Sequence, residues 1–207
     1  MALTAALLVG MAACGTKEVA KTDSASGIAP ASMAMAHDSA ARMKTADANT
    51  GNMAMGNMAM TGDADHDFLR MMTDHHKGLI RMAHETIESK DKLGVKPIAV
   101  KLDKEQDAEM DQMSTMLEKT FKDPYAPKVT PENQTMADEL KGKTGAGYDR
   151  TFLQNVISHH EQSIKMIDAY LPNAKNPELK AMAEKMKAAQ SQQIAELKKQ
   201  VTMMPSK

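Results

Sequence analysis

Residue types that favour β-structure are scarce in this chain. Tryptophan is absent, and aromatic residues make up only 3% of the 207 residues. Clusters of β-branched residues are few, whereas Ala, Lys, Glu, Gln and Met are frequent. The frequent types have high helix propensity, while β-branched and aromatic residues favour strands. The composition therefore predicts an all-α fold.

The chain also lacks an excess of positive charge and a second cysteine. It has 26 Lys and Arg against 27 Asp and Glu, so the charges nearly cancel. A surface that binds phosphate needs a basic patch, and this balance argues against nucleic acid as a partner. Cys14 is the single cysteine, which excludes a disulfide within the chain. Met is the outlier, with 21 copies, and together with 7 His it points to soft-metal chemistry.

The first apolar run is too short to span a membrane. Residues 2–13, ALTAALLVGMAA, fall short of a helix across roughly 30 Å of hydrocarbon, and they are typical of the core of a secretory signal. The run ends in MAAC, which is similar to the bacterial lipoprotein processing box, in which Cys14 is lipidated. We therefore expect an exported, periplasmic or cell-envelope protein that meets the membrane through this lipid anchor only. No Lys or Arg precedes the run, so a start upstream of Met1 stays open, as does an ordinary buried or free Cys14.

Residues 15–62 show neither a helical nor a strand period, and they predict a flexible linker. A Met-x-Met unit recurs there, with one histidine nearby: Met33, Met35, His37, Met53, Met55, Met58 and Met60. Thioethers on a mobile backbone suit Cu(I) and Ag(I), which are soft ions. We interpret the segment as a site of soft-metal capture. The alternatives are low-complexity drift and an oxidation sink, because exposed Met is readily converted to sulfoxide.

The rest of the chain contains the same helical hairpin twice. FLRMMTDHHKGLIRM, residues 68–82, returns as FLQNVISHHEQSIKM, residues 152–166, at an offset of 84 residues. The apolar periodicity predicts four long helices, over residues 64–89, 97–121, 148–171 and 177–203. Caps support the boundaries: Asn176 precedes the last long helix, and a short helix is expected from Thr130 to Gly142. Two amphipathic hairpins bury their apolar faces most economically as a four-helix bundle, here over residues 63–204.

Each copy of the hairpin carries two adjacent histidines at its middle. Helical spacing puts His76 and His160 in the apolar stripe, and it puts His75 and His159 about 100° round the axis. A single buried histidine is usually a satisfied core residue, but duplicated pairs near thioethers favour a copper site. The candidate ligands are His75, His76, Met82, His159, His160, Met166, Met71, Met72, His66, Met53, Met55, Met58 and Met60.

Counting from the turns predicts what surrounds the histidines. Level with the first pair are Gln106, Glu109, Met110 and Met113, and level with the second are Met186, Gln190 and Gln193. A Gln or Glu there can take a ring N–H while a metal takes the other nitrogen. In an up-down-up-down bundle the two histidine helices sit diagonally, farther apart than the roughly 8–10 Å between neighbours. We therefore expect separate sites, one in each hairpin.

The segments DHDFLRMMTDHHKGLIRMA and YDRTFLQNVISHHEQSIKMI, with the Gln-containing helices that follow them, resemble the bacterial domain-of-unknown-function 305 family over residues 63–204. The resemblance implies a ferritin-like four-helix fold and, because some exported members bind copper, a copper-binding protein. It points to one set of characteristic positions: His75, His76, Met82, His159, His160 and Met166. The second copy has Gln193 in place of Glu109 and lacks the two methionines of RMMTDHH, which leaves open whether its site is as strong as the first.

These observations predict an exported protein that binds copper, as Cu(I) in mixed Met and His sites, with Cu(II) and Ag(I) also accepted. Its role would be sequestration, tolerance or transfer to other envelope copper-handling proteins. A di-iron enzyme is disfavoured because the chain contains no Glu-x-x-His, and no nucleophile with an adjacent base is visible. The alternatives are a copper-dependent oxidase, which turnover of Cu(I) or O₂ would reveal, and a structural lipoprotein, which predicts no change in melting temperature with Cu(I) or Ag(I).

Overall fold

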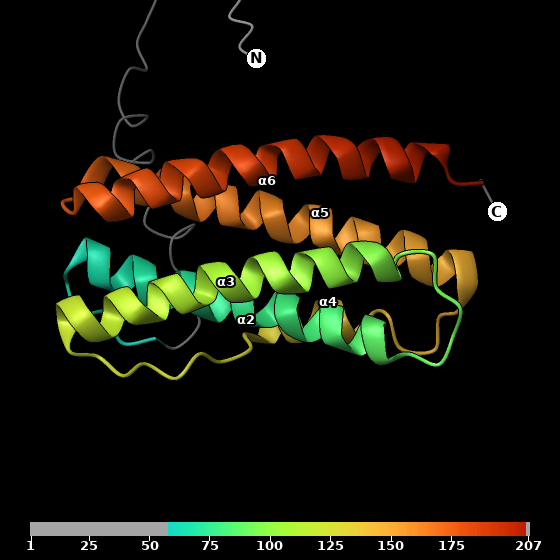
Figure 1. The fold of residues 1–207 in the computed structure, drawn as a ribbon, viewed down its shortest axis with the longest axis horizontal. Coiled ribbons are helices and arrows are strands. Elements are labelled where there is room, and N and C mark those ends of the chain that lie inside the picture. The colour runs from blue at the N-terminus through green and yellow to red at the C-terminus, as the bar shows by residue number, and fades with distance from the viewer. Residues whose placement is uncertain (1–57, 206–207) are drawn as a thin grey trace, which may run out of the picture. The chain divides into compact units, whose positions relative to one another are not determined.

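Residues 58–205 are described by a computed structural model built from helices (Figure 1). The elements are α2 (Ala64–Glu88), α3 (Lys96–Phe121), α4 (Pro131–Asp138), α5 (Gly145–Tyr170), the 3₁₀ helix η1 (Leu171–Asn173) and α6 (Pro177–Met203). No strand occurs among these residues, so the predicted all-α fold is confirmed. In the same part of the chain, no helix combines the length and apolarity needed to cross a membrane. The expected signal, residues 1–14, and the linker up to residue 57 lie outside the described residues.

Capping side chains set several helix boundaries where the sequence predicts them. Asp63, Thr130 and Asn176 each accept hydrogen bonds from backbone N–H groups in the first turn of α2, α4 and α6. These bonds satisfy donors that the first turn of a helix leaves free. The predicted end of α4 is wrong, because the helix stops at Asp138 and the next four residues form turns, with Gly142 at a φ of 73°.

The four long helices form a bundle in which the two hairpins meet through α2 and α5 (Figure 1). Within the hairpins α2 packs against α3, and α5 packs against α6. α5 runs antiparallel to α2, because Tyr170 at its end hydrogen-bonds Asp65 and Tyr148 near its start hydrogen-bonds Thr86. The expected up-down-up-down order is therefore wrong. Residues 122–144 carry the chain back along the bundle before α5 begins (Figure 1).

Side chains of α2 hold this connection in place. Asp74 is buried and accepts hydrogen bonds from the Tyr125 hydroxyl and from the backbone N–H of Lys128, both at 2.7 Å. Asn133 on α4 packs directly on Gly78 of α2, where an added Cβ would lie 2.2 Å from the Asn133 amide nitrogen. Glycine at position 78 therefore lets α4 lie against α2.

Equivalent aspartates in the two copies fix the turn of the opposite hairpin. Asp65 on α2 accepts hydrogen bonds from two backbone N–H groups between α5 and α6, at 3.1 and 2.8 Å. Asp149 on α5, which is its counterpart 84 residues later, accepts from two backbone N–H groups between α2 and α3, at 3.0 and 3.4 Å. This reciprocity indicates an approximate two-fold relation between the hairpins, centred where α2 and α5 cross.

Candidate metal centre

The four histidines of the duplicated motif meet at the middle of the bundle. His75 and His159 are equivalent residues of the two copies, and their rings lie at a centroid distance of 3.7 Å with 34° between the planes. The rings of His76 and His160 lie 6.4 and 6.1 Å from those of their chain neighbours. His75 is 6% exposed and the other three are 1% exposed or less. The expected separation of the two pairs is wrong, because α2 and α5 are neighbours rather than diagonal helices.

These four residues, the histidine layer, divide the apolar core into two parts. One cluster lies toward the α2–α3 turn and includes Leu79, Phe152 and Leu197. The other lies toward the α5–α6 turn and includes Phe68 and Leu179. A buried polar group without a partner costs about 1–3 kcal/mol. Four imidazoles between apolar halves therefore oppose folding unless hydrogen bonds or a ligand compensate them.

Hydrogen bonds satisfy the histidine layer unevenly. His76 donates its Nδ1–H to the carbonyl of Met72 at 2.9 Å, and its Nε2 lies 3.0 Å from a carboxylate oxygen of Glu109. His159 donates its Nε2–H to the carbonyl of His75 at 2.9 Å. Because a carbonyl only accepts, this bond fixes the tautomer of His159 and leaves a lone pair on its Nδ1.

Most of the buried polar atoms that lack a hydrogen-bond partner belong to this level of the bundle. Of the ten such side-chain atoms in residues 58–205, five are ring nitrogens of His75, His159 and His160. Four more are amide oxygens of nearby side chains: Gln106, Asn133, Gln190 and Gln193. Native proteins leave few buried polar groups unpaired, so a group of bare nitrogens marks a place where an ion or a buried water would supply the missing partners. Imidazole nitrogen is a ligand type that divalent and soft transition-metal ions accept.

Burial keeps neutral the three imidazoles that have a ring nitrogen without a partner. It lowers the pKa of His75 and of His159 well below the ordinary value of 6.5, and neighbouring histidines lower both further. Burial and then the neighbouring His76 lower the pKa of His160 to about 4. A neutral imidazole offers a lone pair, whereas an imidazolium offers none. All three rings are therefore in the ligand form at neutral pH.

The rings do not converge on one point as they stand. Within residues 58–205, no three His, Cys, Asp or Glu side chains are grouped so that they could hold an ion. His75 and His159 stack at a tilt instead. An ion at the histidine layer therefore requires a ring to turn, or thioethers to complete its ligands.

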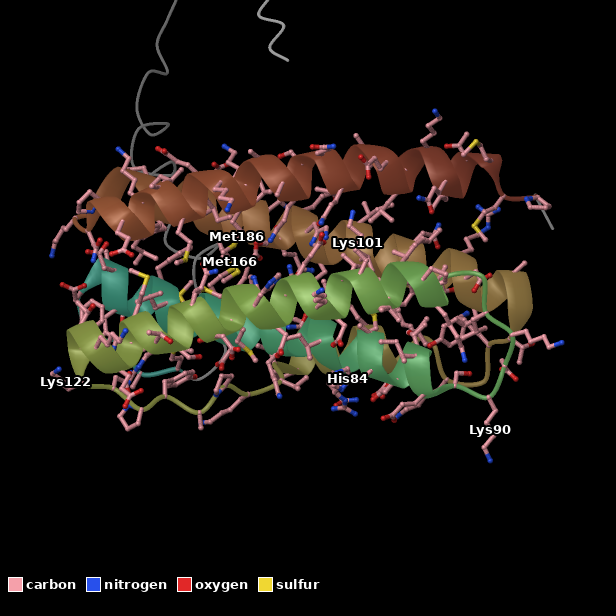
Figure 2. All side chains as sticks on the ribbon, in the orientation of Figure 1. His84, Lys90, Lys101, Lys122, Met166 and Met186 are labelled. Carbon is pink, nitrogen blue, oxygen red and sulfur yellow. The ribbon has the colours of Figure 1, made fainter. Side chains whose placement is uncertain are left out.

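Thioethers lie beside the histidine layer on the side of the α5–α6 turn. Each long helix contributes one buried methionine to the apolar cluster there: Met72, Met113, Met166 and Met186. Met72 accepts a hydrogen bond from the hydroxyl of Ser163 at 3.5 Å, so its sulfur lies against the helix of the second histidine pair. Figure 2 shows Met166 and Met186 together inside the bundle. Soft ligands are thus available next to the imidazoles.

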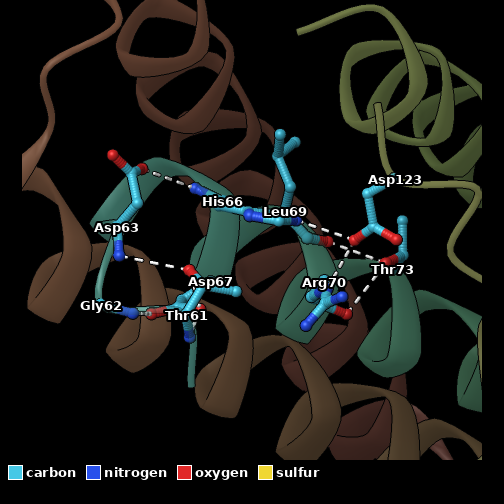
Figure 3. Close-up of polar contacts among 9 residues, drawn as sticks. All are labelled: Thr61, Gly62, Asp63, His66, Asp67, Leu69, Arg70, Thr73 and Asp123. Carbon is cyan, nitrogen blue, oxygen red and sulfur yellow. Dashed lines mark hydrogen bonds and ion pairs between the residues drawn. The ribbon is translucent and has the colours of Figure 1, made fainter. Parts of the chain in front are cut away.

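His66 lies apart from the histidine layer, in the first turn of α2. Its Nε2 is 2.7 Å from the carboxylate of Asp123 (Figure 3). Its ring also stacks on Phe121, with the ring centroids 4.4 Å apart. Arg70 donates to the same carboxylate at 2.6 Å. The hydrogen bond from Arg70, and to a smaller extent that from His66, lowers the pKa of Asp123. This cluster joins the start of α2 to the end of α3, which gives His66 a structural role.

The remaining predicted ligands are spread along the chain. Met71 packs at the edge of the cluster that contains Met72. Met82 lies on the other side of the histidine layer. Met82 and its counterpart Met166 follow the histidines by the same number of residues, but α2 and α5 run antiparallel, so the two methionines lie toward opposite ends of the bundle. Met58 is half-buried, and Met60 is 49% exposed, just before α2. Outside the described residues lie Met33, Met35, His37, Met53 and Met55.

The sequence anticipated two neighbours of the histidines, Glu109 and Gln193, and missed two; Gln193 lies beside His160, as expected. Counting from the turn placed Glu109 beside His76, and their contact confirms it. Ser163 was missed, although it lies one helical turn after His159, a spacing that could have identified it. Asn133 was missed as well. It donates its Nδ2–H to the carbonyl of His75 at 3.3 Å, but it comes from the connection, where no periodicity points to it.

Comparisons with known proteins agree on one family. The sequence profile of the domain of unknown function DUF305 matches residues 12–117 and 122–201. The Cu(II)-bound form of CopM is 26% identical, with a TM-score of 0.57 over 67% of this chain and 95% of that chain. The Cu(I)-bound form of CopM is 25% identical, with a TM-score of 0.56 over the same shares. A DUF305 fragment from Deinococcus radiodurans is 22% identical, with a TM-score of 0.59 over 67% of this chain and 95% of that one, and it shows the fold alone.

No curated protein matches the chain. The profile nevertheless covers most of its length and both copies of the histidine motif. The two-fold hairpin arrangement and the fold shared with solved members agree with that match. This chain belongs to the DUF305 family.

Proposed function

We propose that this chain is an exported, lipid-anchored protein that binds copper for sequestration, tolerance or transfer. Cu(I) is bound by imidazoles of the histidine layer and the thioethers beside it. Ag(I) is accepted in the same way, and Cu(II) where imidazoles dominate. The methionine-rich residues 15–62 gather ions that the bundle then holds. The likeness to CopM, which has been solved with Cu(I), Cu(II) and Ag bound, supports this choice of metal.

The proposal rests on the five buried ring nitrogens that have no hydrogen-bond partner. They belong to three histidines whose lowered pKa values keep them neutral. Left unpaired, each such group costs about 1–3 kcal/mol. Each neutral imidazole has one lone pair, so metal ligation would satisfy one nitrogen in each of the three rings and offset part of this cost.

Export and lipid anchoring rest on the sequence, namely the apolar run of residues 2–13 and the Cys14 that follows it. A lipidated Cys14 has no free thiol. Copper binding then depends on histidine and methionine, which is consistent with the ligands that the bundle offers.

Anaerobic Cu(I) titration of the full chain tests the proposal, with Cys14→Ser included so that no thiol competes. Replacing His159 and His160 together by Ala should remove at least one bound ion or weaken the tightest bundle site by about tenfold or more. His84→Ala is the matched control, because that ring is 58% exposed, pairs with Asp103 and points away from the bundle (Figure 2). Unchanged stoichiometry and affinity in the double variant would contradict the proposed site.

His76 favours one alternative, in which the histidine layer is a purely structural polar layer. Both of its ring nitrogens already have partners within the protein. A structural layer predicts that Ag(I) leaves the melting temperature unchanged. A ligand that binds only the folded state raises it. A rise with Ag(I) that disappears in the His159→Ala/His160→Ala variant would exclude the structural reading.

A further inference from the structure

The two halves of the histidine layer differ in one partner side chain. Glu109 on α3 and Gln193 on α6 are equivalent under the offset of 84 residues. Glu109 places a carboxylate oxygen 3.0 Å from Nε2 of His76. Gln193 donates its amide N–H to Glu105 on α3 at 2.9 Å, and its side chain faces His160 as an uncharged amide. One half therefore presents an anion to its buried imidazole, and the other half presents a neutral amide.

This difference decides which ring nitrogens are free. In His76, Nδ1 donates to the Met72 carbonyl, and one hydrogen lies between Nε2 and Glu109, whichever group carries it. In His160, neither ring nitrogen makes a hydrogen bond of ordinary geometry, and the polar side chain that faces the ring is the neutral amide of Gln193. The two rings are equally buried, at 0% exposure, so solvent does not explain the contrast. A metal needs a bare lone pair, which His160 offers and His76 does not.

Glu109 can also move away at low cost. Its side chain is 32% exposed, whereas that of His76 is 0% exposed. The carboxylate thus reaches the ring from the edge of the bundle. It can turn back into water and take the shared proton with it, so that neutral His76 keeps a lone pair on Nε2 and no buried charge remains. A weak contact of 3.5 Å from Gln106 is its other bond. The group that blocks Nε2 of His76 from a metal ion can therefore be displaced, unlike a side chain packed in the core.

We propose that Glu109 keeps His76 out of the first ligand set, so that the duplicated centre fills asymmetrically. The first ion binds on the side of His159 and His160, and His76 joins only after Glu109 has withdrawn. Gln193 keeps the second half open. This inference rests on the proposed function, and it makes Glu109 a positioning residue that sets the order of filling.

A reciprocal exchange tests the inference, with Glu109→Gln and Gln193→Glu made separately in the full chain carrying Cys14→Ser. The probe is Ag(I), added stepwise while the ring nitrogens of the four histidines are followed by ¹⁵N NMR. In the unmodified chain, the nitrogens of His160 should shift at a lower Ag(I) concentration than those of His76. In Glu109→Gln, both should shift together. In Gln193→Glu, the response of His160 should weaken by about tenfold, in the range of second-layer changes at metal sites.

Both substitutions keep the size of the side chain, and the dispersion of the metal-free spectrum reports whether each variant folds. Glu109→Ala gives a second route to an open His76 should Glu109→Gln not fold. Glu85→Gln is the matched control, because Glu85 pairs with Arg81 on the surface of α2, and it should leave the order unchanged. Simultaneous shifts of His76 and His160 in the unmodified chain, or an order that survives Glu109→Gln, would overturn the inference. Absence of any histidine shift would instead refute the proposed function.

Discussion

At the level of single residues, His160 shows how burial prepares an imidazole for a soft cation. Its side chain is 0% exposed, and burial is the main cause that lowers its pKa to about 4. A second proton therefore does not compete for the one lone pair of this ring at neutral pH. The same neutrality lowers the free energy of unfolding in acid, because this ring binds a proton more readily in the unfolded chain than in the folded one.

The free energy of unfolding of the metal-free chain should consequently fall as pH falls below about 6.5. Between this value and the pKa of about 4 that His160 has in the folded state, the unfolded state binds more protons, so acid favours unfolding. The full loss from His160 alone is on the order of 3 kcal/mol. His75 and His159, whose pKa values are also lowered, act in the same direction. Urea unfolding at neutral pH and at about pH 5, above the range of ordinary carboxylates, measures the effect.

His160→Gln is the control for this prediction, because it keeps a polar side chain that does not titrate. It should reduce the dependence of the unfolding free energy on pH. An equal dependence in the variant and in the unmodified chain would show that the ring of His160 is not a source of it.

At the level of elements, α4 bridges the two helices that carry the histidines. Asn133 donates to the carbonyl of His75 on α2, and Asn155 on α5 donates to the carbonyl of Met136 at 2.8 Å. A helix of eight residues is not stable by itself, so its place depends on such contacts. Gly78 is the position where α4 comes closest to α2.

Gly78→Ala should destabilise the fold, although Ala in a helix is favoured over Gly by about 1 kcal/mol. The added Cβ would lie 2.2 to 2.4 Å from three side-chain atoms of Asn133, and a buried clash of this kind costs about 1–3 kcal/mol. Urea unfolding measures the change. Adding Asn133→Ala removes two of the three clashing atoms, Nδ2 and Cγ, and should recover part of the loss. A stabilised Gly78→Ala variant would show that α4 does not pack on α2 in this way.

Local signals predict the helices better than their arrangement. Thr130 and Asn176 begin their helices as expected, because a capping side chain bonds to residues two or three positions away. The direction of α5 depends instead on contacts such as that of Asp74 with residues 125 and 128, which join distant parts of the chain. No local pattern encodes that path. The histidine pairs could therefore be identified from the sequence, whereas their meeting at one level could not.

At the level of the whole molecule, the duplication places the candidate site at the join between its halves. His75 meets its own counterpart His159 where α2 crosses α5, so both hairpins contribute to a single centre. One copy alone would have only half of these ligands. Under the proposed function, the methionine-rich residues 15–62 supply a second class of ligand, in which thioethers dominate.

Replacing Met53, Met55, Met58 and Met60 together by Leu should separate these two classes. The number of Cu(I) ions bound by the full chain should fall, because Leu has no sulfur. The rise in melting temperature caused by Ag(I) should persist, because the bundle keeps its own ligands. Met203→Leu is a matched control at a 67% exposed position near the end of α6, and it should change neither quantity. An unchanged ion count, or loss of the rise in melting temperature, would contradict this division.

The most direct measurement is copper K-edge X-ray absorption of that four-Leu variant, which also carries Cys14→Ser and is loaded with one equivalent of Cu(I). Met33→Leu, Met35→Leu and His37→Ala are added, so neither the Met-x-Met units nor the thiol can dominate the signal. The account predicts nitrogen scattering with the multiple-scattering features of imidazole, lost when His159 and His160 are replaced by Ala. A spectrum that shows sulfur ligands alone would contradict copper binding at the histidine layer.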